Sequence, residues 1–201
     1  EFVETLDQWQ LPTYRYLPSR HLPLGPKKKK HPVLLVHGLG SNRYDVDFLD
    51  PRLSLAKFLN RQGYDTWVIE LRGAGKSHKK GWVANRLAKL RADWDLDDHI
   101  FRELPAVVAH IQKKSGREKI HWVGHSLGGT IVYAAIETLG NDICASAVTL
   151  GAAMSSMAKP GFIKMLLRLD PLYKKIPFLP TRQLARASVP LGRWLAPLED
   201  N

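Results

Sequence analysis

Short apolar runs alternate with longer stretches of helical spacing along the chain. Four of the runs predict strands: residues 33–36 (VLLV), 66–71 (TWVIEL), 120–124 (IHWVG) and the run ICASAVTLGAA that begins at residue 143. Ahead of them, residues 2–17 predict two short strands around the turn-forming DQW, the second being LPTYRYL.

The spacing predicts three helices, over residues 50–63, about 97–114 and 127–140. Asp50 and Pro51 suit the start of the first helix, because aspartate can cap exposed amides and proline fits the first helical position. Pro105 should kink or loosen the second helix, since it lacks an N–H and its ring crowds the preceding turn.

Strands separated by helices of this length need right-handed crossovers, which predicts a mostly parallel sheet with helices on both faces. Ligands bind such sheets at the carboxyl ends of the strands. Two of these ends carry unusual residues, HGLG after residues 33–36 and GHSLGG after residues 120–124. We therefore expect the chemistry at that edge.

Composition places the chain among ordinary globular proteins, with 201 residues of which 44% are apolar. The single cysteine, Cys144, excludes an internal disulfide framework. No apolar run reaches the roughly 18–20 residues of a spanning helix, and the first ten residues lack the pattern of a signal peptide. We therefore expect a soluble protein, in the cytoplasm or in the lumen of an organelle. The chain begins at Glu1 without Met, which suggests processing or a partial gene.

The chain is basic, with 30 Lys and Arg against 19 Asp and Glu, a formal net charge of +11. Such a charge favours anionic partners, including a phospholipid surface. The densest basic run, Lys27 to Lys30, follows LPLGP and is interpreted as a solvated loop. Because no aromatic residues are interleaved with the basic pairs, we do not expect a nucleic-acid partner.

Gly124, His125, Ser126, Leu127 and Gly128 form the pattern GxSxG between a predicted strand and a predicted helix. In a nucleophile elbow, a serine occupies a strained strand-to-helix turn that lifts its hydroxyl clear of the sheet. The glycines allow strand and helix to pack closely around the turn, and the helix N-terminus stabilises nearby negative charge. The motif therefore predicts that Ser126 is a catalytic nucleophile.

A second glycine-rich turn, His37-Gly38-Leu39-Gly40, follows the first buried strand. Acyl transfer develops a negative oxygen that needs preorganised hydrogen-bond donors. We expect the backbone amides of Leu39 and Leu127 to form this oxyanion hole.

The segments VLLVHGLGSN, VIELRGAGKS and WVGHSLGG occur in this order, and residues 3–153 resemble the α/β-hydrolase superfamily, especially its lipase and esterase branch. The resemblance implies an eight-stranded, mostly parallel sheet with the nucleophile after the fifth strand, an acid after the seventh and a histidine after the last. Residues 33–36, 66–71, 120–124 and 143–151 would be its third to sixth strands.

The resemblance also implies two parts of the chain. Residues 1–153 would be the N-terminal part of the hydrolase core, and residues 154–201 the start of a helical cap inserted after the sixth strand. The apolar content of the second part suits an acyl-chain pocket and equally suits ordinary packing. The C-terminal core strands would then be missing.

The chain departs from the family pattern at the catalytic base. All eight histidines precede Ser126: His21, His31, His37, His78, His99, His110, His121 and His125. Asp142, Asp170 and Asp200 follow Ser126, but none of them follows a recognisable seventh strand. Since serine is a poor nucleophile without a base, we expect the 201 residues alone to show little hydrolysis.

Two further patterns have ordinary explanations. Gly75-Lys76-Ser77 ends like a phosphate-binding loop, but Glu70 replaces the first glycine of that motif. A group of acidic residues precedes the second helix and lacks calcium-loop spacing, which favours helix capping: Asp93, Asp95, Asp97 and Asp98. We expect no metal and no cofactor.

The most favoured function is hydrolysis of carboxylic esters or lipids through an acyl-serine intermediate, because a serine nucleophile suits acyl transfer to water. The acid and base would lie beyond Asn201. One alternative is a non-catalytic member of the superfamily that binds lipid surfaces or a protein partner. An acyltransferase or thioesterase is the other.

Overall fold

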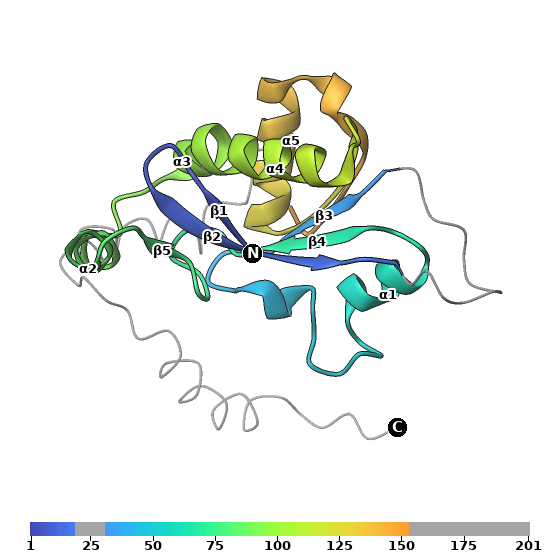
Figure 1. The fold of residues 1–201 in the computed structure, drawn as a ribbon, viewed down its shortest axis with the longest axis horizontal. Coiled ribbons are helices and arrows are strands. Elements are labelled where there is room, and N and C mark those ends of the chain that lie inside the picture. The colour runs from blue at the N-terminus through green and yellow to red at the C-terminus, as the bar shows by residue number, and fades with distance from the viewer. Residues whose placement is uncertain (19–30, 153–201) are drawn as a thin grey trace, which may run out of the picture. The chain divides into compact units, whose positions relative to one another are not determined.

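A computed structural model describes residues 1–18 and 31–152, which form a mixed sheet between two layers of helices (Figure 1). The strands are β1 (Phe2–Glu4), β2 (Trp9–Tyr16), β3 (Val33–Val36), β4 (Thr66–Ile69), β5 (His78–Lys79), β6 (Ile120–His125) and β7 (Cys144–Leu150). Their order in the sheet is β1-β2-β4-β3-β6-β7, with β5 beside β2. The four strands from β4 to β7 along this order are parallel, as the sequence predicts, and the pairs made by β1, β2 and β5 are antiparallel.

The helices lie in the connections between the strands from β3 onward. They are α1 (Leu55–Arg61), α2 (Trp82–Arg91), α3 (Leu96–Asp98), α4 (Leu104–Ser115) and α5 (Leu127–Leu139), with single turns η1 (Arg43–Asp45), η2 (His99–Glu103) and η3 (Asn141–Ile143). Figure 1 shows α4 and α5 on one face of the sheet and α1 on the other. None of the helices in the described ranges is long and apolar enough to cross a membrane.

Strand β3 shows why both faces of the sheet are covered. Its four residues are all buried, and alternate side chains point to opposite faces. Leu34 and Val36 join the core under α4 and α5, whereas Val33 and Leu35 join the smaller core under α1. A continuous apolar run is therefore required at this position, which explains why the sequence pattern located the strand correctly.

The prediction that the first helix starts at Asp50 and Pro51 is wrong. Helix α1 begins at Leu55, and the Ser54 hydroxyl caps it by accepting the amide N–H of Lys57 at 3.1 Å. Ser54 is held in place because its hydroxyl donates to the buried Asp47. Asp50 instead caps a separate turn by accepting the N–H of Arg52.

The region between the second and third buried strands contains more helix than the sequence indicated. Helix α2 lies in the segment between residues 71 and 97, for which the sequence pattern predicts no helix. None of its residues is buried. The predicted helix over residues 97–114 is divided into α3, the π-helical turn η2 and α4, which has Pro105 in its first turn. The widened turn directly precedes Pro105, where the proline ring crowds the carbonyl four residues earlier.

Strand β7 is an edge strand within the described ranges, and several of its side chains are exposed, including Val148 and Leu150. The predicted cap over residues 154–201 lies outside the described residues. The division of the chain into a core and a cap therefore stays a prediction.

Candidate active site

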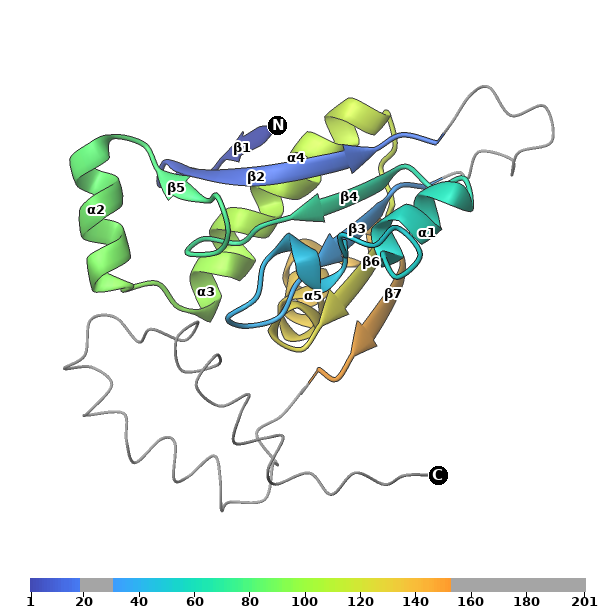
Figure 2. The ribbon, with the colours of Figure 1, turned by 90° about the horizontal axis from the view of Figure 1, so that it is seen from below.

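Two turns leave the carboxyl ends of neighbouring strands. Strands β3 and β6 are parallel partners, and Val36 lies opposite Gly124 in their register. The chain leaves β3 at His37 and leaves β6 at Ser126, so both glycine-rich turns emerge at the same edge (Figure 2). This is the edge at which parallel sheets bind ligands.

Ser126 adopts a strained backbone conformation. Its φ of 50° and ψ of −119° are unusual for a residue with a side chain. The strand side of the turn is fixed by the Ser126 N–H, which donates to the Leu150 carbonyl at 2.8 Å. On the helix side, the Ser126 carbonyl accepts the N–H groups of Gly129 and Thr130. The strain is thus supported by hydrogen bonds from both neighbouring elements, as a nucleophile elbow requires.

The glycines of the GxSxG motif are required by close backbone contacts. A Cβ atom on Gly124 would lie 2.5 Å from the carbonyl oxygen of Gly128 and 2.6 Å from Cα of Gly129. A Cβ atom on Gly128 would collide with the carbonyl oxygens of Val36 and His37. Any side chain at these positions would force β6, α5 and β3 apart and would move the serine.

The HGLG turn lies directly against the serine. A Cβ atom on Gly38 would lie 3.3 Å from Cβ of Ser126, which is closer than ordinary van der Waals contact. Leu39 is 81% exposed, and Leu127 is the first residue of α5. Within the described residues, neither of their amide N–H groups has a hydrogen-bond acceptor. Two unpaired donors thus flank the serine turn.

His37 fastens the HGLG turn to the sheet. Its ring is buried, its Nε2 atom accepts the N–H of Leu71 at 3.1 Å, and its Nδ1 atom lies 2.8 Å from the carbonyl oxygen of Gly38. These partners require a neutral ring that carries its proton on Nδ1. Burial lowers the pKa of His37 below its ordinary value, because desolvation disfavours the charged ring. Both nitrogens are occupied, so His37 has no free atom with which to act as a base.

Asp45 links the two turns, and the sequence motifs gave no sign of it. Its Oδ2 atom accepts the N–H of Gly38 at 2.8 Å and lies 2.7 Å from Nδ1 of His125. The same carboxylate thereby contacts the turn after β3 and the residue before Ser126. His125 is directed at Asp45, and no side chain of the described residues hydrogen-bonds the Ser126 hydroxyl.

Another serine of the described residues does have a histidine partner. The Ser146 hydroxyl in β7 lies 2.8 Å from Nδ1 of His121. His121 is the second residue of β6, near the amino end of the parallel strands, and it lies opposite Ser146 of β7 beside a shift in the register of the two strands. This pair has neither the strained turn nor the unpaired amides of Ser126.

The turn after β4 is filled by a carboxylate. Glu70 accepts the N–H of Lys76 at 2.8 Å, and a Cβ atom on Gly75 would collide with the Glu70 carboxyl group. A phosphate group would meet this negative charge at the place where a phosphate-binding loop offers amides. The geometry is therefore unsuited to nucleotide binding.

Beside that turn lies a buried cluster of ion pairs, which the sequence patterns also did not indicate. Arg72 is 4% exposed and Glu103 is fully buried. The Arg72 guanidinium donates to Glu103 and forms further ion pairs with Asp7 at 3.0 Å and with Asp98 at 3.2 Å. Arg102 also pairs with Asp98 at 2.8 Å. The cluster joins the β1–β2 hairpin, the end of β4 and the start of α4.

The acidic residues ahead of α4 cap a helix, as the sequence predicts. The Asp95 carboxylate accepts the N–H groups of Asp97 and Asp98, and the Asp98 side chain accepts the N–H of Asp95 in return. No group of three or more histidine, cysteine or acidic residues within residues 1–18 and 31–152 is arranged to hold a metal ion.

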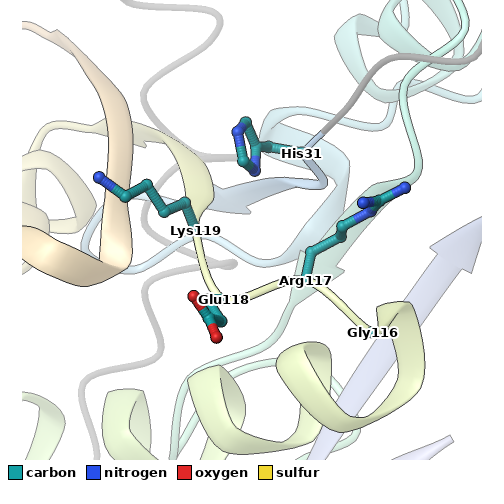
Figure 3. A pocket seen from close by; sticks show the side chains of 5 residues that line it. All are labelled: His31, Gly116, Arg117, Glu118 and Lys119. Carbon is teal, nitrogen blue, oxygen red and sulfur yellow. The ribbon is translucent and has the colours of Figure 1, made fainter.

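A surface hollow of about 490 Å³ lies away from the serine. It is lined by His31, which precedes β3, and by residues 116–119, which precede β6 (Figure 3). These residues lie at the amino ends of strands whose carboxyl ends carry the glycine-rich turns. The hollow therefore belongs to the opposite edge of the sheet.

Comparison with known proteins adds the family. Residues 31–177 match the model of the alpha/beta hydrolase fold family. The chain is 34% identical to gastric triacylglycerol lipase of Rattus norvegicus over 76% of this chain and 36% of the relative. It is also 34% identical to lipase member K of Homo sapiens over 68% of this chain and 34% of the relative. The chain thus spans about a third of the length of these curated relatives.

Solved structures agree on the fold. A carboxylesterase from Nitrososphaera gargenis superimposes with a TM-score of 0.60 at 14% identity, covering 100% of this chain and 59% of the other. Est1E from Butyrivibrio proteoclasticus, solved with ferulic acid, superimposes with a TM-score of 0.53 at 22% identity, covering 73% of this chain and 50% of the other. Sequence and fold together show that this chain belongs to the α/β-hydrolase superfamily, in its lipase and esterase branch.

Proposed function

We propose that the protein at its natural length is a serine hydrolase that cleaves carboxylic esters or lipids through an acyl-serine intermediate. The observation that carries the proposal is the conformation of Ser126, a strained residue at the N-terminus of α5 with the Gly38 turn against its side chain. The lipases among its relatives support an ester of a lipid as the substrate class.

In the proposed first step, the Ser126 oxygen attacks the ester carbonyl carbon while a general base takes the hydroxyl proton. The carbonyl oxygen becomes an oxyanion, and the amide N–H groups of Leu39 and Leu127 donate to it. Leu127 adds the favourable field of the α5 N-terminus. The protonated base then gives its proton to the leaving alcohol, and an acyl ester remains on Ser126. A water molecule then gives a proton to the base and attacks the acyl carbon. The bond from that carbon to the Ser126 oxygen breaks, the serine oxygen takes the proton from the base, and the carboxylic acid is released.

The base and acid of this mechanism would come from beyond the described residues. His37 has both ring nitrogens occupied, and the Nδ1 atom of His125 contacts Asp45. The 201-residue chain would therefore retain only binding and oxyanion stabilisation, which in a serine protease leave roughly 10³–10⁴-fold catalysis over water when the triad is removed. We expect hydrolysis by this chain to be far slower than hydrolysis by the protein at natural length.

The test is hydrolysis of p-nitrophenyl esters of increasing acyl length by the protein at natural length. Ser126→Ala should lose nearly all activity, and Ser146→Ala should keep it, since Ser146 also has a histidine neighbour but no elbow. Activity that survives in Ser126→Ala would overturn the proposal. Adding a short alcohol or a thiol to the same assay distinguishes an acyltransferase from a hydrolase. An acyltransferase forms the new ester or thioester faster than it forms the free acid.

The formal net charge of +11 favours one alternative of another class, a non-catalytic member of the superfamily that binds lipid surfaces or a protein. This alternative predicts a folded protein of natural length with no esterase activity on any acyl length. Ser126→Ala would then leave every measured property unchanged.

A further inference from the structure

Helix α2 exposes an unusual amount of apolar surface. None of its ten residues is buried, and four large apolar side chains are solvent-exposed: Trp82 (75%), Val83 (59%), Leu87 (46%) and Leu90 (51%). Exposed apolar side chains are unremarkable when they are scattered, but a contiguous group on one element indicates an interaction surface.

The spacing places these side chains on one side of the helix. Val83, Leu87 and Leu90 are separated by four and three residues, so they form a single stripe. The opposite side faces the protein, where Ala88 packs against the main core. The apolar stripe is therefore on the outside of the part of the chain that the structure describes.

Cationic side chains flank the stripe. Arg86 and Lys89 lie on one side of it and Arg91 on the other, and α2 contains no acidic residue. The Arg86 guanidinium lies 5.7 Å from the ring centroid of Trp82. Acidic side chains follow only after the helix, at Asp93 and beyond.

Both ends of α2 are fixed to the sheet. At its start, the N–H of Lys79 in β5 donates to the Asn85 side chain at 3.0 Å. After its end, Trp94 packs edge-on against Trp9 and fills the space beside Gly73, in the turn that follows β4. In Figure 2 the arrow of β4 points toward the side on which α2 lies. The helix is thus presented rigidly beyond the carboxyl end of β4.

We propose that α2 docks the protein on an anionic lipid surface, with the apolar stripe and Trp82 entering the headgroup region and the flanking cations contacting lipid phosphates or carboxylates. Short helices with an apolar stripe, an aromatic residue and Lys or Arg at its borders bind membranes in this orientation. The proposal does not depend on the chemistry of Ser126.

Charge argues against two other occupants of this surface. Residues 153–201 carry eight Lys and Arg against three Asp and Glu, so they would add positive charge beside a positive helix. A second copy of α2 would likewise place positive charge beside the positive charge of the first. An anionic lipid surface is complementary to all of these groups.

The test is flotation of the protein with vesicles of phosphatidylcholine alone or with about 30% phosphatidylserine, at low and at high salt. The parent should float with the anionic vesicles at low salt and not with neutral ones. Leu87→Glu combined with Leu90→Glu should weaken partitioning by about 100-fold, and Arg86→Gln combined with Lys89→Gln by about 30-fold. Leu49→Glu combined with Leu53→Glu is the matched control, because these side chains are also exposed (79% and 67%) but lie far from α2 in sequence and outside any helix.

Thermal unfolding of each variant separates loss of docking from loss of folding. Ser126→Ala should float like the parent, so a failure of the proposed hydrolase function would leave this result unaffected. The proposal is overturned if the parent does not float with anionic vesicles, or if a folded Leu87→Glu, Leu90→Glu variant floats as the parent does. Concentration-dependent dimers that disappear in this variant, without flotation of the parent, would assign the surface to a second copy of the chain and would also overturn it.

Discussion

Replacing Arg72 by methionine should destabilise the protein strongly, because it leaves a buried carboxylate without its cationic partner. Glu103 has no solvent exposure and receives both the side-chain and the backbone N–H groups of Arg72. Its other close neighbour is Nδ1 of His99, which lies 3.1 Å away but makes no hydrogen bond. Removal of Arg72 therefore leaves Glu103 with little compensation.

The magnitude follows from how the remaining partners are placed. Breaking a buried ion pair by removing one member costs about 3–5 kcal/mol. Asp7 and Asp98 lose Arg72 as well, but both are partly solvated and keep Arg102 as a partner. For a chain of this size the cost corresponds to a fall in Tm of about 6–20 °C.

A double-mutant cycle measured by urea unfolding tests the reasoning. Arg72→Met and Glu103→Leu should each lower the free energy of unfolding. The double variant should recover more than half of the summed loss, because two apolar groups of similar size replace the pair. Additive losses in the double variant would show that Arg72 and Glu103 do not stabilise each other and would refute the account.

Three further predictions concern the turns around the serine. Gly124→Ala should lower the free energy of unfolding, measured with urea, by about 1–3 kcal/mol, since its Cβ atom would meet backbone atoms of α5. Gly116→Ala is the control: the space around Gly116 is open, so only its left-handed backbone should cost stability, about 1 kcal/mol. Asp45→Asn should lower the free energy of unfolding by about 1.5–3 kcal/mol by weakening its charge-assisted bonds, and an unchanged stability would contradict the link between the turns. The pKa of His37 is lowered in the folded state, so the unfolded state binds the proton more readily. The contribution of the neutral ring to stability is therefore complete above about pH 6.5 and is lost as the pH falls toward the folded-state pKa. The fall in Tm between pH 7.5 and 5.5 should be smaller in His37→Gln than in the parent.

The sequence predicted the four parallel strands within a few residues because each is a short apolar run, and β3 and β4 are buried along their whole length in the sheet. It failed where tertiary contacts choose between local options. Asp50 and Pro51 are a good helix start, but the contact of Ser54 with the buried Asp47 moves the start of α1 to Leu55. Helix α2 was missed, although Val83, Leu87 and Leu90 recur at helical spacing, because it is only ten residues long and lies between polar segments.

In the candidate site, too, local motifs were predicted from the sequence and long-range contacts were not. Ser126 and the HGLG turn stand in local motifs that steric rules require, so the pattern was sufficient to locate the two turns, and their catalytic role stays a prediction. Asp45 lies 80 residues from His125 in the chain, and Arg72 lies 31 residues from Glu103. Contacts over such separations depend on how the strands pair, and they leave no spacing in a single sequence. The acid and base of the proposed mechanism stay predictions.

The most direct measurement of the central claim is covalent labelling by a fluorophosphonate of the protein at natural length, read by tandem mass spectrometry. The phosphorus reagent reacts with an activated serine and loses fluoride, so the adduct identifies the nucleophile. We predict a single adduct on Ser126 that Ser126→Ala abolishes and Ser146→Ala leaves unchanged. An adduct elsewhere, or no adduct on a folded protein of natural length, would contradict the assignment of Ser126 as the nucleophile.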